Sequence, residues 1–307
     1  MTLAGVLCGM GAGALWGLVF LAPELVRAFS PLQLTVGRYL AYGFMSALLI
    51  VPRWRQLFAM LSRRDWLALC WFALAGNTLY YVLLSTAVQT GGIAMTSLVI
   101  GFLPVAVTII GSRDQGAVPL ARLAPSLLLC MAGAVCIGWQ ALAALASGSV
   151  QAQLIGLGCA IGALISWTAF AVGNSRSLTR LGHVSVYDWN LLIGIVTGGQ
   201  ALLLVPMTLA LDTWDQSPAL WLNFAGVSAG VAIFASLAGN ALWNRMSRLL
   251  PLTLVGQMIL FETLFALIYG FLWEQRLPTG MEMAAFAFVA LSVISCISAH
   301  QRKERPA

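Results

Sequence analysis

The chain has 307 residues, of which 60% are hydrophobic and only 8% are charged. Soluble globular chains carry about 25% charged residues, so this composition excludes an ordinary soluble domain and indicates an integral membrane protein. The net charge of +6 does not indicate nucleic-acid binding, because anionic lipid headgroups attract arginines at the cytoplasmic face of a membrane.

Ten apolar stretches, each about long enough to cross a bilayer as a helix, follow one another along the chain. In chain order they are residues 3–23, 33–52, 66–87, 93–111, 123–141, 153–174, 187–209, 219–241, 252–271 and 280–300. With the N-terminus inside, thirteen Lys or Arg residues fall on the cytoplasmic side, and only Arg27 and Arg276 fall outside. The positive-inside rule therefore predicts that both termini are cytoplasmic, as in a multi-pass protein of the bacterial inner membrane.

The two halves of the chain echo each other. Trp16 and Trp167 lie 151 residues apart, and each follows a glycine-rich turn of an apolar stretch. Residues 94–104 echo residues 253–263 at an offset of 159. Each half holds five stretches, an odd number, so the second half would enter the membrane with the opposite orientation. Inverted repeats are a transporter architecture whose substrate site lies near the midplane. The predicted repeats are residues 1–145 and 146–307.

Several short motifs carry a resemblance to a known family. They are Gly13 to Trp16, Trp167, Ala87 to Ala94, Pro104, Asn240 to Asn244, Glu262, and Trp273 with Glu274. With these, essentially the whole chain resembles the drug/metabolite transporter superfamily, of the EamA-like ten-helix type, and is similar to its aromatic-amino-acid exporters. Two features depart from the family pattern: Thr263 stands where proline usually follows the glutamate, and Gly111 to Asp114 lack the glutamate expected after the fourth helix.

Glu262 lies near the middle of the ninth stretch. A carboxylate exposed to lipid there would cost roughly 2.5 to 3.5 kcal/mol on insertion scales. One interpretation is that Glu262 faces a central cavity and binds a substrate amino group or a coupling proton. The other is that a protonated carboxyl only braces a neighbouring helix.

Arg38 is the second embedded charge and lies about five residues into the second stretch. Its long side chain could snorkel to the headgroups. Alternatively, Arg38 could hold a substrate carboxylate beside Tyr42, which shares its helix face at i+4.

Aromatic and amide side chains are predicted to line a cavity between the halves, because amides facing lipid are unfavourable. Asn77 lies at i+3 and i+4 from Tyr80 and Tyr81, and Asn240 shares this spacing with Trp243 and Asn244. The predicted cavity residues are Trp16, Arg38, Tyr42, Asn77, Tyr80, Tyr81, Ser97, Trp167, Asn240, Trp243, Asn244, Gln257 and Glu262. Interfacial belts also collect tryptophan and tyrosine, and tryptophans near the ends of stretches, such as Trp221, are assigned to them.

Small residues and one proline are predicted to serve helix packing or bending. Gly9, Gly13 and Gly17 recur at four-residue spacing, and Gly158 with Gly162 repeats it, which lets neighbouring helix backbones approach closely. Pro104 is expected to bend the fourth helix, either as a hinge or as a static kink.

The chain lacks the sequence motifs of an enzyme or a nucleotide-driven pump. It has no Gly-x-Ser-x-Gly elbow, no metal-spaced Cys/His set and no Walker-type loop. No cofactor or metal is therefore predicted. The leading hypothesis, which rests on the resemblance, is a secondary transporter that exports small organic metabolites by alternating access. Amino acids are the expected substrates, large neutral or aromatic ones in view of the aromatic cavity. The alternatives are an exporter of lipophilic cations or drugs, and a passive channel or non-transporting accessory protein.

Overall fold

The computed structural model describes residues 2–91, 93–144, 150–275 and 277–304. It is 87% helical, with no strand in these ranges. Eight of its helices are long and apolar enough to cross a membrane, and a shorter apolar helix covers Leu120–Cys136. The prediction of an all-helical, membrane-spanning chain is confirmed. The boundary predicted between residues 145 and 146 falls outside the described residues.

The helices follow the apolar stretches, but several stretches are divided. The first half contains α1 (Thr2–Gly17), α2 (Ala22–Leu25), α3 (Pro31–Ile50), α4 (Trp54–Met60), α5 (Arg63–Ala73), α6 (Leu79–Gly91), α7 (Ile93–Ile100), α8 (Leu103–Gly111) and α9 (Leu120–Ala144). The second half contains α10 (Val150–Arg180), α11 (Val186–Leu211), α12 (Pro218–Val231), α13 (Asn240–Leu249), α14 (Leu252–Met258), α15 (Leu260–Glu274) and α16 (Gly280–Glu304).

Serine N-caps explain why four helices begin one to three residues before the predicted stretches. The Ser30 side chain accepts a hydrogen bond from the backbone N–H of Gln33 at the start of α3, and Ser62, Ser185 and Ser217 cap α5, α11 and α12 in the same way. These bonds satisfy backbone donors that the first helical turn leaves free. Hydropathy alone does not locate these helix starts, because the capping serines are polar residues outside the apolar stretches.

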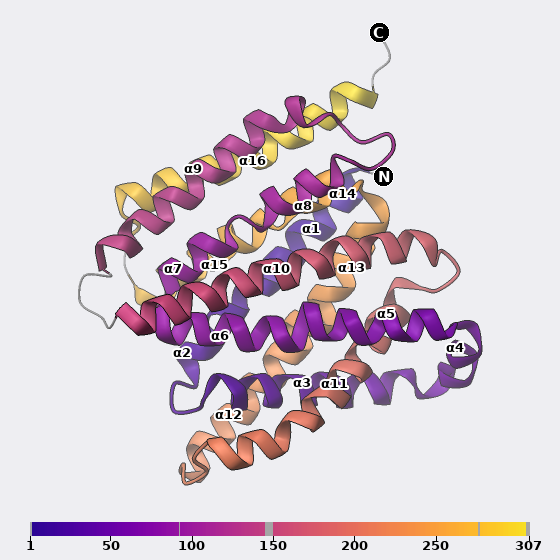
Figure 1. Cartoon of the computed structure of the whole chain (residues 1–307), viewed down its shortest axis with the longest axis vertical. Coiled ribbons are helices and arrows are strands. Elements are labelled where there is room, and N and C mark those ends of the chain that lie inside the picture. The colour runs from indigo at the N-terminus through magenta and orange to yellow at the C-terminus, as the bar shows by residue number, and fades with distance from the viewer. Residues whose placement is uncertain (1, 92, 145–149, 276, 305–307) are drawn as a thin grey trace.

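Helices from opposite halves of the chain lie side by side (Figure 1). α3 packs along α11, α6 along α10, and α9 along α16. α1 packs against α13 and α15, while α8 packs against α14. The α9 and α16 pair lies at one edge of the bundle, and the α3 and α11 pair lies toward the opposite edge (Figure 1).

The stretch predicted as one helix over 93–111 is two short helices. α7 ends at Ile100, and the turn at residues 101 and 102 separates it from α8. Pro104 lies in the first turn of α8, where it gives up no helical hydrogen bond. In a continuous helix its ring would clash with the carbonyl of Ile100. The helix is therefore interrupted before Pro104, and the expected bend within a continuous helix is not found.

The stretch over 252–271 is also interrupted. α14 ends at Met258, Ile259 forms a turn, and α15 begins at Leu260. The backbone N–H of Glu262 donates to the carbonyl oxygen of Ile259 at 2.9 Å. This break places Glu262 in the first turn of α15 rather than in the middle of a single helix, at a helix end where the backbone dipole favours negative charge.

Two spans contain a π-helical segment. Leu74–Thr78 joins α5 to α6, and Ala232–Gly239 joins α12 to α13. A π-helix shifts the backbone hydrogen bonds to i→i+5 and changes which side chains share a face, and such segments occur frequently at functional sites.

Gly13 and Gly17 let the backbones of α1 and α15 approach closely. A Cβ atom at Gly13 would lie 2.5 Å from the Cβ of Phe261 and 2.7 Å from the backbone nitrogen of Glu262, and one at Gly17 would lie 2.9 Å from the nitrogen of Ala266. Gly9 faces the side chains of Met246 and Met258.

The glycines of α10 differ from those of α1. At Gly162 a Cβ atom would lie 3.2 Å from the end of the Leu83 side chain, whereas at Gly158 nothing lies within 4 Å. The close packing expected at Gly158 is therefore not found, because this residue is on an exposed face of α10.

Candidate functional site

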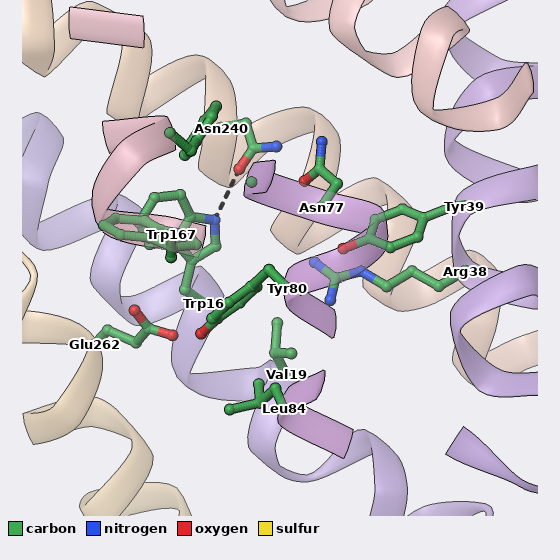
Figure 2. Close-up of a pocket in the computed structure, with 12 residues that line it drawn as sticks. Trp16, Val19, Arg38, Tyr39, Asn77, Tyr80, Leu84, Trp167, Asn240 and Glu262 are labelled. Carbon is green, nitrogen blue, oxygen red and sulfur yellow. Dashed lines mark hydrogen bonds between the residues drawn. The ribbon is translucent and has the colours of Figure 1, made fainter. Parts of the chain in front are cut away.

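A small cavity lies between helices of the two halves (Figure 2). It is lined by Trp16, Val19, Arg38, Tyr39, Gly76, Asn77, Tyr80, Leu84, Trp167, Phe170, Asn240 and Glu262. The cavity volume is about 40 Å³, which accommodates a few water molecules. Sites for small organic ligands measure about 300 to 1,000 Å³, so a ligand of that kind requires the helices to move apart.

Three tryptophans form one wall of this region. The ring centroid of Trp16 lies 5.8 Å from that of Trp167 and 5.0 Å from that of Trp243, and the last two are 5.2 Å apart. Trp167 meets Trp16 edge to face, a favoured arrangement of aromatic rings. Trp16 and Trp167 line the cavity, whereas Trp243 packs behind them.

The indole N–H of Trp16 fixes the ring to the second half of the chain. Nε1 lies 3.1 Å from both the carbonyl oxygen of Ala235 and the Oδ1 of Asn240. Ala235 belongs to the π-helical segment Ala232–Gly239, and Asn240 is the first residue of α13. Trp16 therefore links α1 to α13 at the edge of the cavity (Figure 2).

Arg38 is 7% exposed and lines the cavity from α3. Its Nε donates to the Oγ of Ser236 at 3.2 Å, and its guanidinium lies 5.0 Å from the ring centroid of Tyr39 and 4.6 Å from that of Tyr81. Neither Nη atom has a hydrogen-bond partner among the described residues. Because the side chain turns into the protein interior, snorkelling does not describe its position.

Glu262 reaches the cavity from α15, on the far side of Tyr80 from Arg38 (Figure 2). In the described part of the chain, its carboxyl group has no hydrogen-bond or ion-pair partner. Bracing a neighbouring helix would require such a partner.

Asn77 and Tyr80 also line the cavity, but Tyr81 does not. Tyr81 packs against the guanidinium of Arg38 and the ring of Tyr39. Asn77 donates from Nδ2 to the Oγ1 of Thr197 at 3.0 Å. Tyr80 and Tyr81 are consecutive residues of α6 and point about 100° apart on a helix with 3.6 residues per turn, so only Tyr80 faces the cavity beside Asn77.

Three predicted cavity residues lie elsewhere in polar networks. The Tyr42 hydroxyl donates to Asn190, 2.8 Å from both its carbonyl oxygen and its Oδ1. The Oδ1 of Asn244 accepts from the Nδ2 of Asn174 at 2.9 Å. Gln257 bonds to Thr108 and accepts from Ser292, between α8, α14 and α16. The Ser97 side chain lies outside the described part of the structure. These three side chains find polar partners between helices, so their burial did not require a cavity.

Five lining residues were not predicted from the sequence: Val19, Tyr39, Gly76, Leu84 and Phe170. Tyr39 adjoins Arg38, and Gly76 adjoins Asn77, so neighbours of the predicted residues would have found two of them. Val19, Leu84 and Phe170 are apolar residues in apolar helices. No sequence signal separates them from packing residues.

Comparison with known proteins gives a family. The sequence model of the EamA-like transporter family matches residues 3–139. The chain is 30% identical over 321 aligned residues to "Inner membrane protein YtfF" of Escherichia coli (strain K12), covering 98% of this chain and 97% of that protein. A crystal structure with 16% sequence identity superposes with a TM-score of 0.75, covering 98% of this chain and 100% of that one, which shows a shared fold. The chain thus belongs to the EamA-like transporter family, as its motifs predicted.

Proposed function

We propose that this chain is a secondary transporter of the inner membrane that exports amino acids, large neutral or aromatic ones, by alternating access through the cavity. The observation that carries the proposal is the pair of opposite ionisable groups, Arg38 and Glu262, that enter one aromatic-walled cavity. The name of the Escherichia coli relative, an inner membrane protein, supports the location.

An amino acid zwitterion complements this cavity at both ends. Its carboxylate would pair with the guanidinium of Arg38, and its ammonium with the carboxylate of Glu262. Buried charges are unfavourable unless they are paired, so a ligand that pairs both is favoured over one that pairs neither. Trp16 and Trp167 would contact an apolar side chain. A lipophilic cation would be held by Glu262 and the aromatic rings but repelled by Arg38.

The proposed architecture has ten spans in two inverted five-helix repeats, residues 1–145 and 146–307. The ten are the eight long helices, α9, and the divided helix formed by α7 and α8. Internal equivalences support the repeat. The offset of 159 carries the π-helical segment Leu74–Thr78 onto Ala232–Gly239, and it carries the break at 101–102 to within two residues of the break at Ile259.

The pairing of helices also supports a twofold relation between the halves. α3 packs on α11 and α9 on α16, and each pair joins helices at equivalent positions in the two halves. The contact of α1 with α13 is mirrored by that of α10 with α6.

We propose that the helix ends rich in arginine face the cytoplasm. Three ion pairs join the two halves there: Arg180 with Asp65 at 2.6 Å, Arg53 with Asp188 at 3.0 Å, and Arg176 with Asp114 at 2.6 Å. In alternating access these pairs would separate when the cavity opens to the cytoplasm.

Counterflow in proteoliposomes tests the proposed function. Uptake of labelled phenylalanine is expected to rise several-fold when unlabelled phenylalanine is present inside the vesicles, because an alternating carrier returns faster when loaded. Vesicles that contain the same amount of Trp16→Ala protein are the control, and they should show less uptake than vesicles with the parent protein. Uptake that does not respond to internal substrate would indicate a channel or accessory protein, and stimulation by a lipophilic cation alone would favour the alternative substrate class.

The tryptophan wall provides a second test. Trp16→Ala and Trp167→Ala are expected to lower phenylalanine transport about fivefold or more, because each removes an aromatic surface of the cavity. Trp221→Ala is the control, since Trp221 packs against Phe29 and Trp214 away from the cavity. Transport rates are compared at equal membrane abundance. Equal losses in all three variants would assign the cavity tryptophans to general packing.

A further inference from the structure

The π-helical segment Ala232–Gly239 contacts the residues that shape both sides of the cavity. The carbonyl oxygen of Ala235 accepts from Trp16, and that of Leu237 accepts from the Nδ2 of Asn190 at 3.0 Å. A π-helical turn leaves carbonyl oxygens out of the ordinary i→i+4 pattern. Here side-chain N–H donors from α1 and α11 reach two of the segment's carbonyl oxygens, so the segment joins neighbouring helices.

Ser236, in the same segment, is fully buried, and its hydroxyl accepts from the Nε of Arg38. Helix α3 has a second link to this segment, because Tyr42 donates to Asn190, which in turn donates to Leu237. The π-helical segment therefore holds α3 at two points one helical turn apart.

The guanidinium of Arg38 is restrained on three sides. Ser236 engages Nε, and the rings of Tyr39 and Tyr81 lie 5.0 and 4.6 Å from its central carbon. The edge formed by the two Nη atoms remains available, and Arg38 lines the cavity. A guanidinium edge presents two parallel N–H donors, which match the two oxygens of a carboxylate.

We infer that Ser236 is a positioning residue for Arg38: it directs the Nη edge of the guanidinium into the cavity, where that edge binds the carboxylate of the transported molecule. Ser236 itself does not line the cavity. It acts by occupying Nε, which removes the two-donor edge formed by Nε and one Nη atom and leaves the edge formed by the two Nη atoms for the ligand. This inference rests on the proposed function and adds a residue that determines selectivity for carboxylated substrates.

The test compares phenylalanine with phenylalanine amide, which keeps the ammonium, the ring and the size but replaces the carboxylate by a neutral group. The dissociation constants are measured on the purified full-length protein in lipid nanodiscs. For the parent protein we expect phenylalanine to bind at least about tenfold more tightly than the amide, since a hydrogen-bonded charge pair is lost with the amide.

In Ser236→Ala, this preference is expected to fall about tenfold, because Arg38 loses its fixed orientation. Affinity for the amide should change less than about twofold. Ser228→Ala is the matched control: Ser228 is also buried and precedes the same π-helical segment on α12, whereas the hydrogen bond from the Nε of Arg38 goes to Ser236. Its preference should equal that of the parent protein.

Arg38→Lys provides a second variant that keeps the charge but removes the two-donor edge, and it should also lose the preference. Equal weakening of both ligands in Ser236→Ala would show a general packing role and would overturn the inference, as would an unchanged preference. A parent protein without preference would mean that Arg38 does not bind the carboxylate. A parent protein that binds neither ligand and shows no counterflow would instead overturn the proposed function.

Discussion

Replacing Glu262 with glutamine is expected to reduce phenylalanine transport about a hundredfold while the protein still folds and reaches the membrane. Glutamine keeps the size and hydrogen-bonding capacity of the side chain but removes its negative charge. The substrate ammonium would then enter the cavity without a charged partner, opposite the guanidinium of Arg38. Hydrogen bonds to charged groups contribute about 1.5 to 3 kcal/mol, and a hundredfold loss corresponds to about 2.7 kcal/mol.

The measurement is counterflow at equal amounts of reconstituted protein, over a range of pH values. Asp215→Asn makes the same chemical change at an exposed position between α11 and α12 and should leave transport unaltered. If Glu262 also exchanges a proton, transport by the parent protein will depend on pH and the glutamine variant will lose that dependence. Full activity of Glu262→Gln with an unchanged pH profile would remove Glu262 from the functional site.

Gly13→Leu is expected to destabilise the protein by about 3 kcal/mol, near the upper end of the effects of overpacking, and to abolish most transport. The new Cβ would lie within 2.5 to 2.7 Å of the α15 backbone and the Cβ of Phe261, at the turn that carries Glu262. Neither backbone can yield as a flexible side chain would, so α15 must move away from α1. That movement would displace the Glu262 carboxyl group from the cavity.

Gly158→Leu is the matched control, because it introduces the same side chain at a helical glycine with nothing within 4 Å of its Cβ position. Thermal unfolding midpoints in one detergent and counterflow rates should both match those of the parent protein. If Gly13→Leu behaved like Gly158→Leu, the tight contact between α1 and α15 would not determine the position of Glu262. If Gly13→Leu and Gly158→Leu lowered the unfolding midpoint and the counterflow rate equally, these glycines would be needed for helix insertion rather than for close packing of α1 on α15.

The amino-acid sequence alone predicted an all-helical membrane protein and the family the chain belongs to. Long apolar stretches separated by short polar gaps require helices in lipid, because the backbone must satisfy its hydrogen bonds within each segment. This argument needs no knowledge of neighbouring helices. The sequence also predicted that Trp16, Arg38 and Glu262 line a cavity, as they do. A charged side chain in an apolar stretch is unfavourable in lipid whatever the neighbouring helices are, and Trp16 lies too far from the ends of its stretch to belong to an interfacial belt.

Tertiary structure alone decided which face of each helix meets the cavity. Both Tyr80 and Tyr81 have a spacing that fits the helical face of Asn77, but only Tyr80 lines the cavity with it. Tyr42 and Gln257 are as polar as the lining residues, yet they bond to neighbouring helices. In a chain that is 60% hydrophobic, lipid-facing and helix-facing residues have similar composition. The orientation of a side chain therefore depends on interhelical contacts, which a one-dimensional hydropathy pattern does not encode.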